Sequence, residues 1–157
     1  MHTLNKNERL GNYRLRQILF TRGHHFFRYP FRVAWFLAPE DELARAFPGS
    51  VMPGNARFRY PAKILVGVSR RNQRKAVDRN RVKRLVKEAY RKNKNLFYPF
   101  LQRKQACLLL GMIYVGKSLP TYAETEAAVR AILTELVGRM EKAGKGQVDD
   151  TREINGR

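Results

Sequence analysis

The chain has 157 residues, of which 32 are Lys or Arg and 13 are Asp or Glu, so its formal net charge is +19 at pH 7. One domain of this length can bury a sizeable core, whereas two domains would be cramped. A fold with so much positive self-repulsion normally has a polyanionic partner, with nucleic acid as the first candidate and an anionic membrane surface as the second.

Signals for membrane insertion or export are missing from the sequence. No apolar run approaches the roughly 20 residues that span a bilayer, and residues 1–10 lack the apolar core of a signal peptide. We therefore expect a soluble, cytoplasmic protein with no membrane partner, although an Arg-rich, acid-poor start would also suit a mitochondrial presequence. Cys107, the one cysteine, lies in an apolar run, and neither a disulfide framework nor a zinc site can be built from it.

The first expected element is a short helix that Asn12 caps, that runs to about Arg22, and that Gly23 ends in the left-handed conformation which glycine tolerates. One face of this helix is aliphatic and consists of Leu15, Ile18 and Leu19. The opposite face consists of Tyr13, Arg16 and Phe20. Phe20 is an aromatic that the core does not obviously claim, so packing under the next segment and contact with a ligand are both open.

The segment that follows, residues 24–37, is rich in aromatic and β-branched residues. From Phe31 it alternates, with an inner face of Phe31, Val33, Trp35 and Leu37 and an outer face of Arg32, Ala34 and Phe36. Such a partly basic, partly aromatic outer face suits the stacking of single-stranded RNA. A sheet packed by helices on both faces is the alternative.

Two further strands and a closing helix follow from pattern. Residues 62–69 alternate, with Ile64, Val66 and Val68 on one face, and residues 106–115 form the near-continuous apolar run typical of a central strand. Thr121 and Glu124 make a capping box at the start of a clearly amphipathic helix.

The remaining segments are expected to be irregular. Residues 38–61 carry an acidic patch and Pro-Gly turn signals and read as a long mobile loop, and residues 95–104 read as a connection. Residues 143–157 are polar and without period, so we expect a disordered tail after one RNA-binding domain over residues 1–142. The order of elements predicts an α+β domain in which helices cover one sheet.

The most charged stretch runs from Ser69 to Lys94 and has only two acids, Asp78 and Glu88. A run of like charge usually indicates a solvated or disordered tail. Here, however, the apolar residues share one side of a helix: Val82, Leu85, Val86, Ala89 and Tyr90. Asp78 lies at its N-cap or in its first turn, where a carboxylate opposes the helix dipole. The register predicts a helix with one core face and one cationic face that meets phosphate.

We find no catalytic constellation in the sequence. There is no carboxylate pair near a histidine, no nucleophile motif, no metal-binding motif and no phosphate-binding glycine loop. Any reaction in which this chain takes part is therefore expected to take its chemistry from the partner.

Residues 76–91, AVDRNRVKRLVKEAYR, resemble the signature of the protein subunit of bacterial ribonuclease P, in which an Arg-Asn-Arg core precedes Lys-Arg on a long helix. The resemblance extends to the SRR of residues 69–71, the ERL of residues 8–10, the first helix with its glycine and the closing helix, and it covers about residues 8–140. It implies a two-layer α+β domain like a domain of ribosomal protein S5, ordered α-β-β-β-α-β-α around a mixed sheet of about four strands, with a left-handed βαβ crossover.

The resemblance also implies a function. The family binds the catalytic RNA and helps it to recognise precursor tRNA, whose 5′ leader is removed by hydrolysis that depends on Mg2+ held by the RNA; one copy of the protein per RNA is expected. The candidate contacts with the catalytic RNA are Arg70, Arg71, Arg79, Asn80, Arg81, Lys83, Arg84, Lys87 and Arg91. The candidate contacts with the leader, in a cleft between the first helix and the sheet, are Tyr13, Arg16, Phe20, Arg32 and Phe36.

Three departures from the family pattern bear on these residues. Arg16 stands where a second aromatic is expected, so the leader contact there shifts to Tyr13 or becomes electrostatic. Lys87 stands where Arg is common, which keeps the charge but loses the bidentate fork. The segment before the long helix lacks a glycine that many members carry and is one residue longer, which leaves the start of the helix open.

Two other functions share the composition. A ribosomal or general RNA-binding protein would have the same charge and fold, and only its partner would differ. An independent protein nuclease is disfavoured by the missing catalytic groups.

Overall fold

The computed structural model describes residues 4, 8–11, 13–39, 61–104 and 106–145. Its elements are, in chain order, α1 (Tyr13–Arg22), β1 (His24–Arg28), β2 (Phe31–Pro39), β3 (Ala62–Val68), α4 (Ala76–Asn93), the short 3-10 helix η2 (Lys94–Leu96), α5 (Tyr98–Lys104), β4 (Ala106–Tyr114) and α6 (Tyr122–Lys145). The four strands form one sheet in the order β1-β2-β4-β3, in which only β3 and β4 are parallel. The α+β class and the order of elements are as expected.

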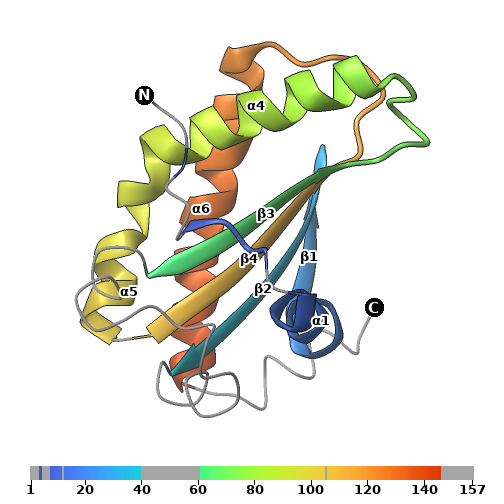
Figure 1. Cartoon of the computed structure of the whole chain (residues 1–157). Coiled ribbons are helices and arrows are strands. Elements are labelled where there is room, and N and C mark those ends of the chain that lie inside the picture. The colour runs from blue at the N-terminus through green and yellow to red at the C-terminus, as the bar shows by residue number, and fades with distance from the viewer. Residues whose placement is uncertain (1–3, 5–7, 12, 40–60, 105, 146–157) are drawn as a thin grey trace.

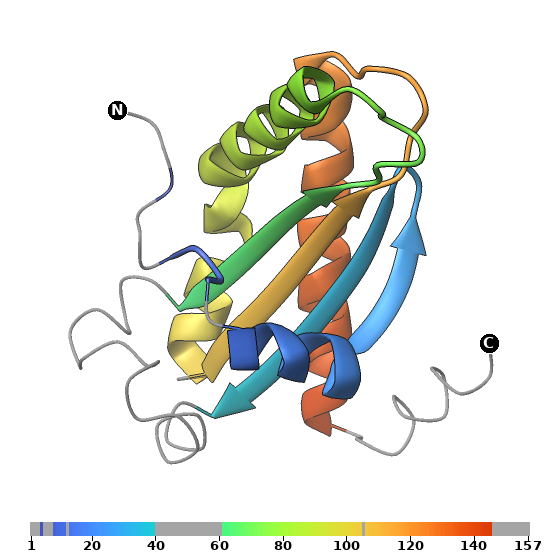
Figure 2. The ribbon, with the colours of Figure 1, turned by 45° about the vertical axis from the view of Figure 1, so that its right-hand side comes forward.

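The sheet separates two cores of different size. Helices α4 and α6 cover one face, and α1 lies across part of the other (Figures 1 and 2). The residues Phe31, Val33 and Trp35 of β2 point into the larger core under α4 and α6. Ala34 and, half-buried, Phe36 point to the smaller core under α1. We call these two sides of the sheet the helix-layer face and the α1 face.

The central position of β4 explains its unbroken apolar sequence. It pairs with β2 on one side and β3 on the other. Leu108 and Leu110 belong to the larger core, whereas Cys107 and Leu109 belong to the smaller one. Because both of its faces are packed along most of its length, every residue of the strand except the half-buried Ile113 is buried.

The long helices begin as their sequences indicate. At the start of α6 the Thr121 amide donates to Glu124 Oε1 (3.0 Å), and the Glu124 amide donates to Thr121 Oγ1 (3.1 Å), which is the expected capping box. Asp78 lies in the first turn of α4, and the N-cap residue is Lys75, whose side chain makes no capping bond. Of the two positions open for Asp78, the structure therefore takes the first turn.

Some boundaries differ from expectation. Residues 95–104, expected as a plain connection, contain the end of η2 and all of α5, which is helical because Tyr98, Phe100 and Leu101 all find places in the core. Helix α6 continues to Lys145, so it includes the first three residues of the expected tail. Residues 38 and 39, expected in the loop at 38–61, are the end of β2, and residues 40–60 and 146–157 lie outside the described residues.

Gly23 follows α1 for a reason other than the one expected. No glycine in the described part of the chain has a positive φ, so a left-handed cap is not what the position requires. A Cβ at residue 23 would instead overlap the carbonyl oxygen of Leu19 and lie 2.8 Å from that of Trp35. Both obstacles are backbone atoms, so the junction between α1 and β1 can close only around a residue without a side chain.

Replacing Gly23 with Ala should lower the free energy of unfolding by roughly 1–3 kcal/mol, because the added methyl group forces two backbone segments apart. Gly138→Ala is the matched control, since a Cβ at this position in α6 meets no atom within 4 Å. It should raise stability by about 0.5–1 kcal/mol through helix propensity. Urea denaturation of both variants measures the difference, and equal effects of the two changes would contradict the steric explanation.

Candidate RNA interface

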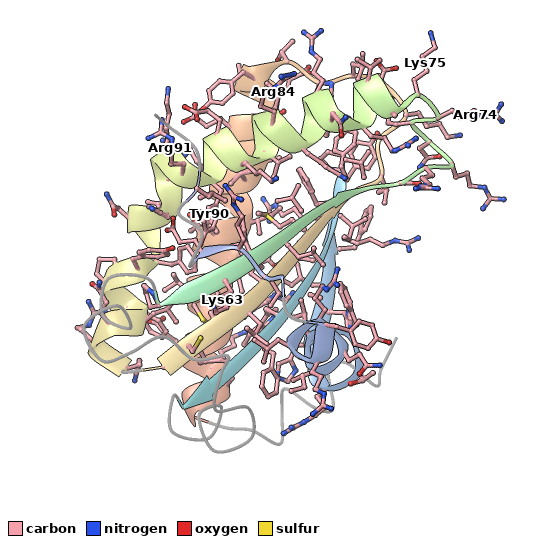
Figure 3. The ribbon with its side chains drawn as sticks, viewed as in Figure 1. Lys63, Arg74, Lys75, Arg84, Tyr90 and Arg91 are labelled. Carbon is pink, nitrogen blue, oxygen red and sulfur yellow. The ribbon has the colours of Figure 1, made fainter. Side chains whose placement is uncertain are left out.

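Helix α4 turns its cations to solvent because its other side is buried. The buried side consists of Val82, Val86, Ala89 and Tyr90. The exposed side consists of Asn80, Arg81, Arg84 and Lys87, and we call these four residues the cationic face. Arg81 and Arg84 make no side-chain hydrogen bond or ion pair with the described residues, and Figure 3 shows Arg84 on the side of α4 away from the sheet. These guanidinium groups keep all their donors available for phosphate.

A pocket of about 290 Å³ lies along the cationic face. Its lining consists of Leu4, Arg9, Asn80, Lys83, Arg84, Lys87 and Glu88. The pKa of Lys87 is lowered first by burial and then by the positive charges of Arg9 and Lys83. The second cause indicates that like charges lie close together here. An anion in the pocket would relieve this repulsion. Arg9 was not among the residues expected from the sequence.

Arg9 reaches the pocket because the N-terminal segment, residues 8–11, is fastened to the body of the domain. The Leu10 amide donates to the carbonyl oxygen of Ile64 (2.8 Å), and Arg9 forms an isolated bridge with the same residue. Glu8, only 1% exposed, accepts hydrogen bonds from Lys94 Nζ and from the Tyr98 hydroxyl, both at 2.6 Å. Burial, then the neighbouring Tyr90 and Glu8, raises the pKa of Tyr98, so its hydroxyl stays protonated and donates.

The loop before α4, residues 69–75, carries further cations on a pinned backbone. Asn72 Nδ2 donates to the carbonyl oxygen of Val115 (2.7 Å), and Gln73 Nε2 donates to those of Gly116 and Ser118 (3.2 Å each). These amides hold the loop against the chain that leaves β4. The exposed cations of this loop are Arg70, Arg71, Arg74 and Lys75. Figure 3 shows Arg74 and Lys75 extending from the chain at the N-terminal end of α4.

Two of the expected RNA contacts have partners inside the protein. Arg79 Nη1 donates to the carbonyl oxygens of Gln73 (3.1 Å) and Arg74 (2.7 Å), so this guanidinium closes the start of α4 onto the basic loop. Arg91 forms a two-pronged pair with Glu88, at 3.1 and 2.7 Å, which raises the pKa of Arg91. The cations that make no such bonds with the described residues lie between these two, in the middle of α4: Arg81, Lys83, Arg84 and Lys87.

On the α1 face, Phe20 lies over the backbone of β4. A Cβ added at Gly111 would lie 3.5 Å from its ring, so the glycine leaves room for the ring close to the strand. Phe20 nevertheless remains 41% exposed. Part of the ring packs over β4, and contact of its exposed part with a ligand stays a prediction.

The other candidate leader contacts differ in how accessible they are. Tyr13 is 66% exposed, Arg32 is exposed on β2, and Arg16 is half-buried with an Nε atom that has no hydrogen-bond partner in the described part of the chain. Phe36 packs in the smaller core, and the guanidinium of Arg22 lies 5.1 Å above its ring. The structure thus gathers Tyr13, Arg16 and Phe20 along α1, while Phe36 is already covered.

Other kinds of site were sought in the same residues. No three His, Cys, Asp or Glu side chains among those described lie close enough together to hold a metal ion. None of the helices within the described ranges is long and apolar enough to cross a membrane.

A mixed sheet backed by two helices, with a helix that turns cations to solvent and exposed aromatic rings on the opposite face of the sheet, is typical of an RNA-binding protein. Residues 4–137 match the family model for ribonuclease P. The chain belongs to the ribonuclease P protein family.

Individual relatives agree with this assignment. The chain is 34% identical over 137 residues to the ribonuclease P protein component of Porphyromonas gingivalis strain W83, covering 87% of this chain and 88% of the relative. It is 32% identical over 85 residues to that of Chlorobaculum tepidum, covering 50% and 55%. The structure of the Staphylococcus aureus RNase P protein superposes with a TM-score of 0.55 at 15% identity, over 82% of this chain and 94% of that one, which supports the fold.

Glu8→Gln should destabilise the protein by about 2–4 kcal/mol, because it removes the buried anion that Lys94 and Tyr98 both contact. Glu135→Gln is the control: this carboxylate also pairs with two arginines, but its side chain is 26% exposed, so we expect a loss within about 1 kcal/mol. Urea unfolding followed by circular dichroism gives both values. A loss for Glu8→Gln no larger than that of the control would show that the segment is not fastened by this carboxylate.

Proposed function

We propose that this chain, as the protein subunit of ribonuclease P, binds the catalytic RNA through α4 and the 5′ leader of precursor tRNA through the α1 face. The observation that carries the proposal is the cationic face of α4, directed to solvent by its buried opposite side, in a chain that belongs to this family. Family membership also separates this function from that of a ribosomal or general RNA-binding protein with the same charge and fold.

The contact with the catalytic RNA is electrostatic. Arg81 and Arg84 supply fork-shaped donors, Lys83 and Lys87 supply point charges, and Arg9 closes the pocket beside them. The exposed cations of the 69–75 loop extend this surface beyond the N-terminus of α4. Each phosphate that such a surface neutralises releases counterions, so binding falls steeply with salt.

Hydrolysis of the phosphodiester bond is assigned to the RNA, in a complex with one copy of this chain. The protein offers cations, amides and aromatic rings, which bind and orient RNA but do not activate water. Mg2+ is a hard cation that prefers phosphate and water oxygens, and the RNA subunit supplies the phosphates. Because the relatives are bacterial, we place the complex in the cytoplasm, where bacterial RNA is transcribed.

The leader contact rests on Phe20 and the cations around it. A base that stacks on the exposed part of the Phe20 ring would share the α1 face with two cations, Arg16 one turn earlier on α1 and the exposed Arg32 of β2. Stacking of this kind contributes roughly 1–3 kcal/mol per base and tolerates any sequence. A protein that binds 5′ leaders of different sequences needs contacts that tolerate any base.

Reconstitution with the cognate catalytic RNA and a precursor tRNA at low Mg2+ tests the assignment to ribonuclease P. The protein should stimulate cleavage by the RNA, and it should cleave nothing alone. The Arg81→Ala/Arg84→Ala double variant should bind the catalytic RNA more weakly, with a log–log salt slope smaller by about 1.4–1.8, the value for two lost phosphate contacts. Arg103→Ala/Arg130→Ala removes the same charge from α5 and α6 and is the control. Equal slopes for the two double variants would overturn the role of α4, and cleavage by protein alone would overturn the assignment of the chemistry.

Phe20→Ala should leave assembly with the catalytic RNA unchanged and weaken holoenzyme binding of precursor tRNA by about 5- to 150-fold, because one base loses its stacking partner. Binding of mature tRNA, which lacks the leader, serves as the internal reference. If affinity for precursor and mature tRNA fell equally, Phe20 would not contact the leader.

A further inference from the structure

Part of the α1 face is left open beside α1. One row of paired residues crosses this area from β1 to β3: Phe27, Arg32, Ile113 and Gly67. Phe27 is 58% exposed, Arg32 is exposed, and Gly67 has no side chain to raise above the sheet. Phe27 and Arg32 therefore stand side by side near the edge of the sheet, with the half-buried Ile113 and Gly67 beyond Arg32.

The register of β1 fixes the side on which Phe27 lies. Phe26 points into the larger core, with the guanidinium of Arg139 from α6 4.3 Å above its ring. Successive side chains of a strand alternate, so Phe27 points to the α1 face. A shift of one residue would exchange the two rings and expose a core residue.

Phe27 has a second exposed ring beside it. Tyr29, which follows β1, is 70% exposed, and its ring centroid lies 6.3 Å from that of Phe27. Large aromatic side chains normally bury most of their surface, and a pair left in solvent at a sheet edge indicates a binding surface.

The charge around this pair favours RNA over an apolar protein partner. Arg32 is the cross-strand neighbour of Phe27 on the α1 face, and Arg16 and Arg22 line the same face from α1. Glu135, which contacts Arg28 of this edge strand, is also paired with Arg139. Arg32 makes no hydrogen bond or ion pair with the described residues, and an exposed ring next to such a cation binds a base by its π-face and the adjoining phosphate by charge.

The position also separates this pair from Phe20. Phe20 lies over Gly111, which pairs through Ala34 with His25. Phe27 lies on β1, two strands away from β4, and two residues along β1 from His25. At the usual strand spacing and rise, this places it about 12 Å from Gly111. A base at Phe27 therefore belongs to a different nucleotide from a base at Phe20.

We propose that Phe27, with Tyr29 beside it, is a second stacking site for the single-stranded 5′ leader, occupied by a different nucleotide from the one at Phe20. The inference rests on the proposed leader-binding function. It adds an edge-strand contact that the cleft beside α1 does not contain, and it assigns a binding role to the one exposed aromatic pair in the described part of the sheet.

The test is a set of holoenzymes bound to precursors whose leaders are shortened one nucleotide at a time. Phe27→Ala and Phe27→Leu should each weaken binding of long-leader precursors by about 5- to 150-fold, whereas Phe27→Trp should retain it, because only a ring can stack. The loss should vanish below a leader length that differs from the length at which the Phe20→Ala loss vanishes. Leu96→Ala, a 44% exposed apolar residue in η2, is the control and should change nothing.

The outcomes separate the inference from the function beneath it. If Phe20→Ala weakens leader binding and Phe27→Ala does not, the second site is overturned and the leader function stands. If neither variant changes precursor affinity, leader binding by this face fails altogether. Wild-type affinity of Phe27→Leu, or an equal loss for mature tRNA, would overturn stacking on the leader.

Discussion

Burial of one side of α4 is the constraint on which the binding surface depends. Val82, Val86 and Tyr90 are fully buried, and each contributes roughly 1.5–3 kcal/mol by leaving water. That contribution fixes the rotation of the helix, because turning it would expose these side chains and bury arginine. The direction of the cationic face is thus a consequence of core packing, and the self-repulsion of a chain with net charge +19 is tolerated because the core opposes it.

The N-terminal segment extends this surface by a different interaction. Glu8 is buried between Lys94 and Tyr98, which are 86 and 90 residues away in sequence. A buried carboxylate with two donors has a single satisfactory position, and the residue that follows it, Arg9, is thereby placed at the pocket on α4. The buried contacts of Glu8 thus determine that Arg9 lies at the surface pocket.

The sequence predicted the periodic parts of this molecule and missed those that depend on distant partners. The register of α4, the alternation of β2 and the capping box of α6 are local patterns, and the structure confirms them. The position of Arg9 was not predictable because no local pattern connects Glu8 with Lys94. Gly23 was correctly predicted to follow α1, but for the wrong reason. Two carbonyl oxygens exclude a side chain at this position, and one of them belongs to Trp35 on β2. The engagement of Arg79 with the preceding loop likewise depends on a loop conformation held by contacts to residues 115–118.

The layered fold gives the two proposed RNA sites separate faces of the domain. The helix layer needs both α4 and α6 to cover one face of the sheet, so α4 carries its cations on the outside of that layer. Helix α1 is only 10 residues long and covers part of the opposite face, which leaves a row of β1, β2, β4 and β3 open beside it. Because the sheet lies between them, an RNA bound on α4 does not occupy the space over the α1 face. The proposed sites for the catalytic RNA and the leader can therefore be filled together, which a holoenzyme that holds its substrate requires.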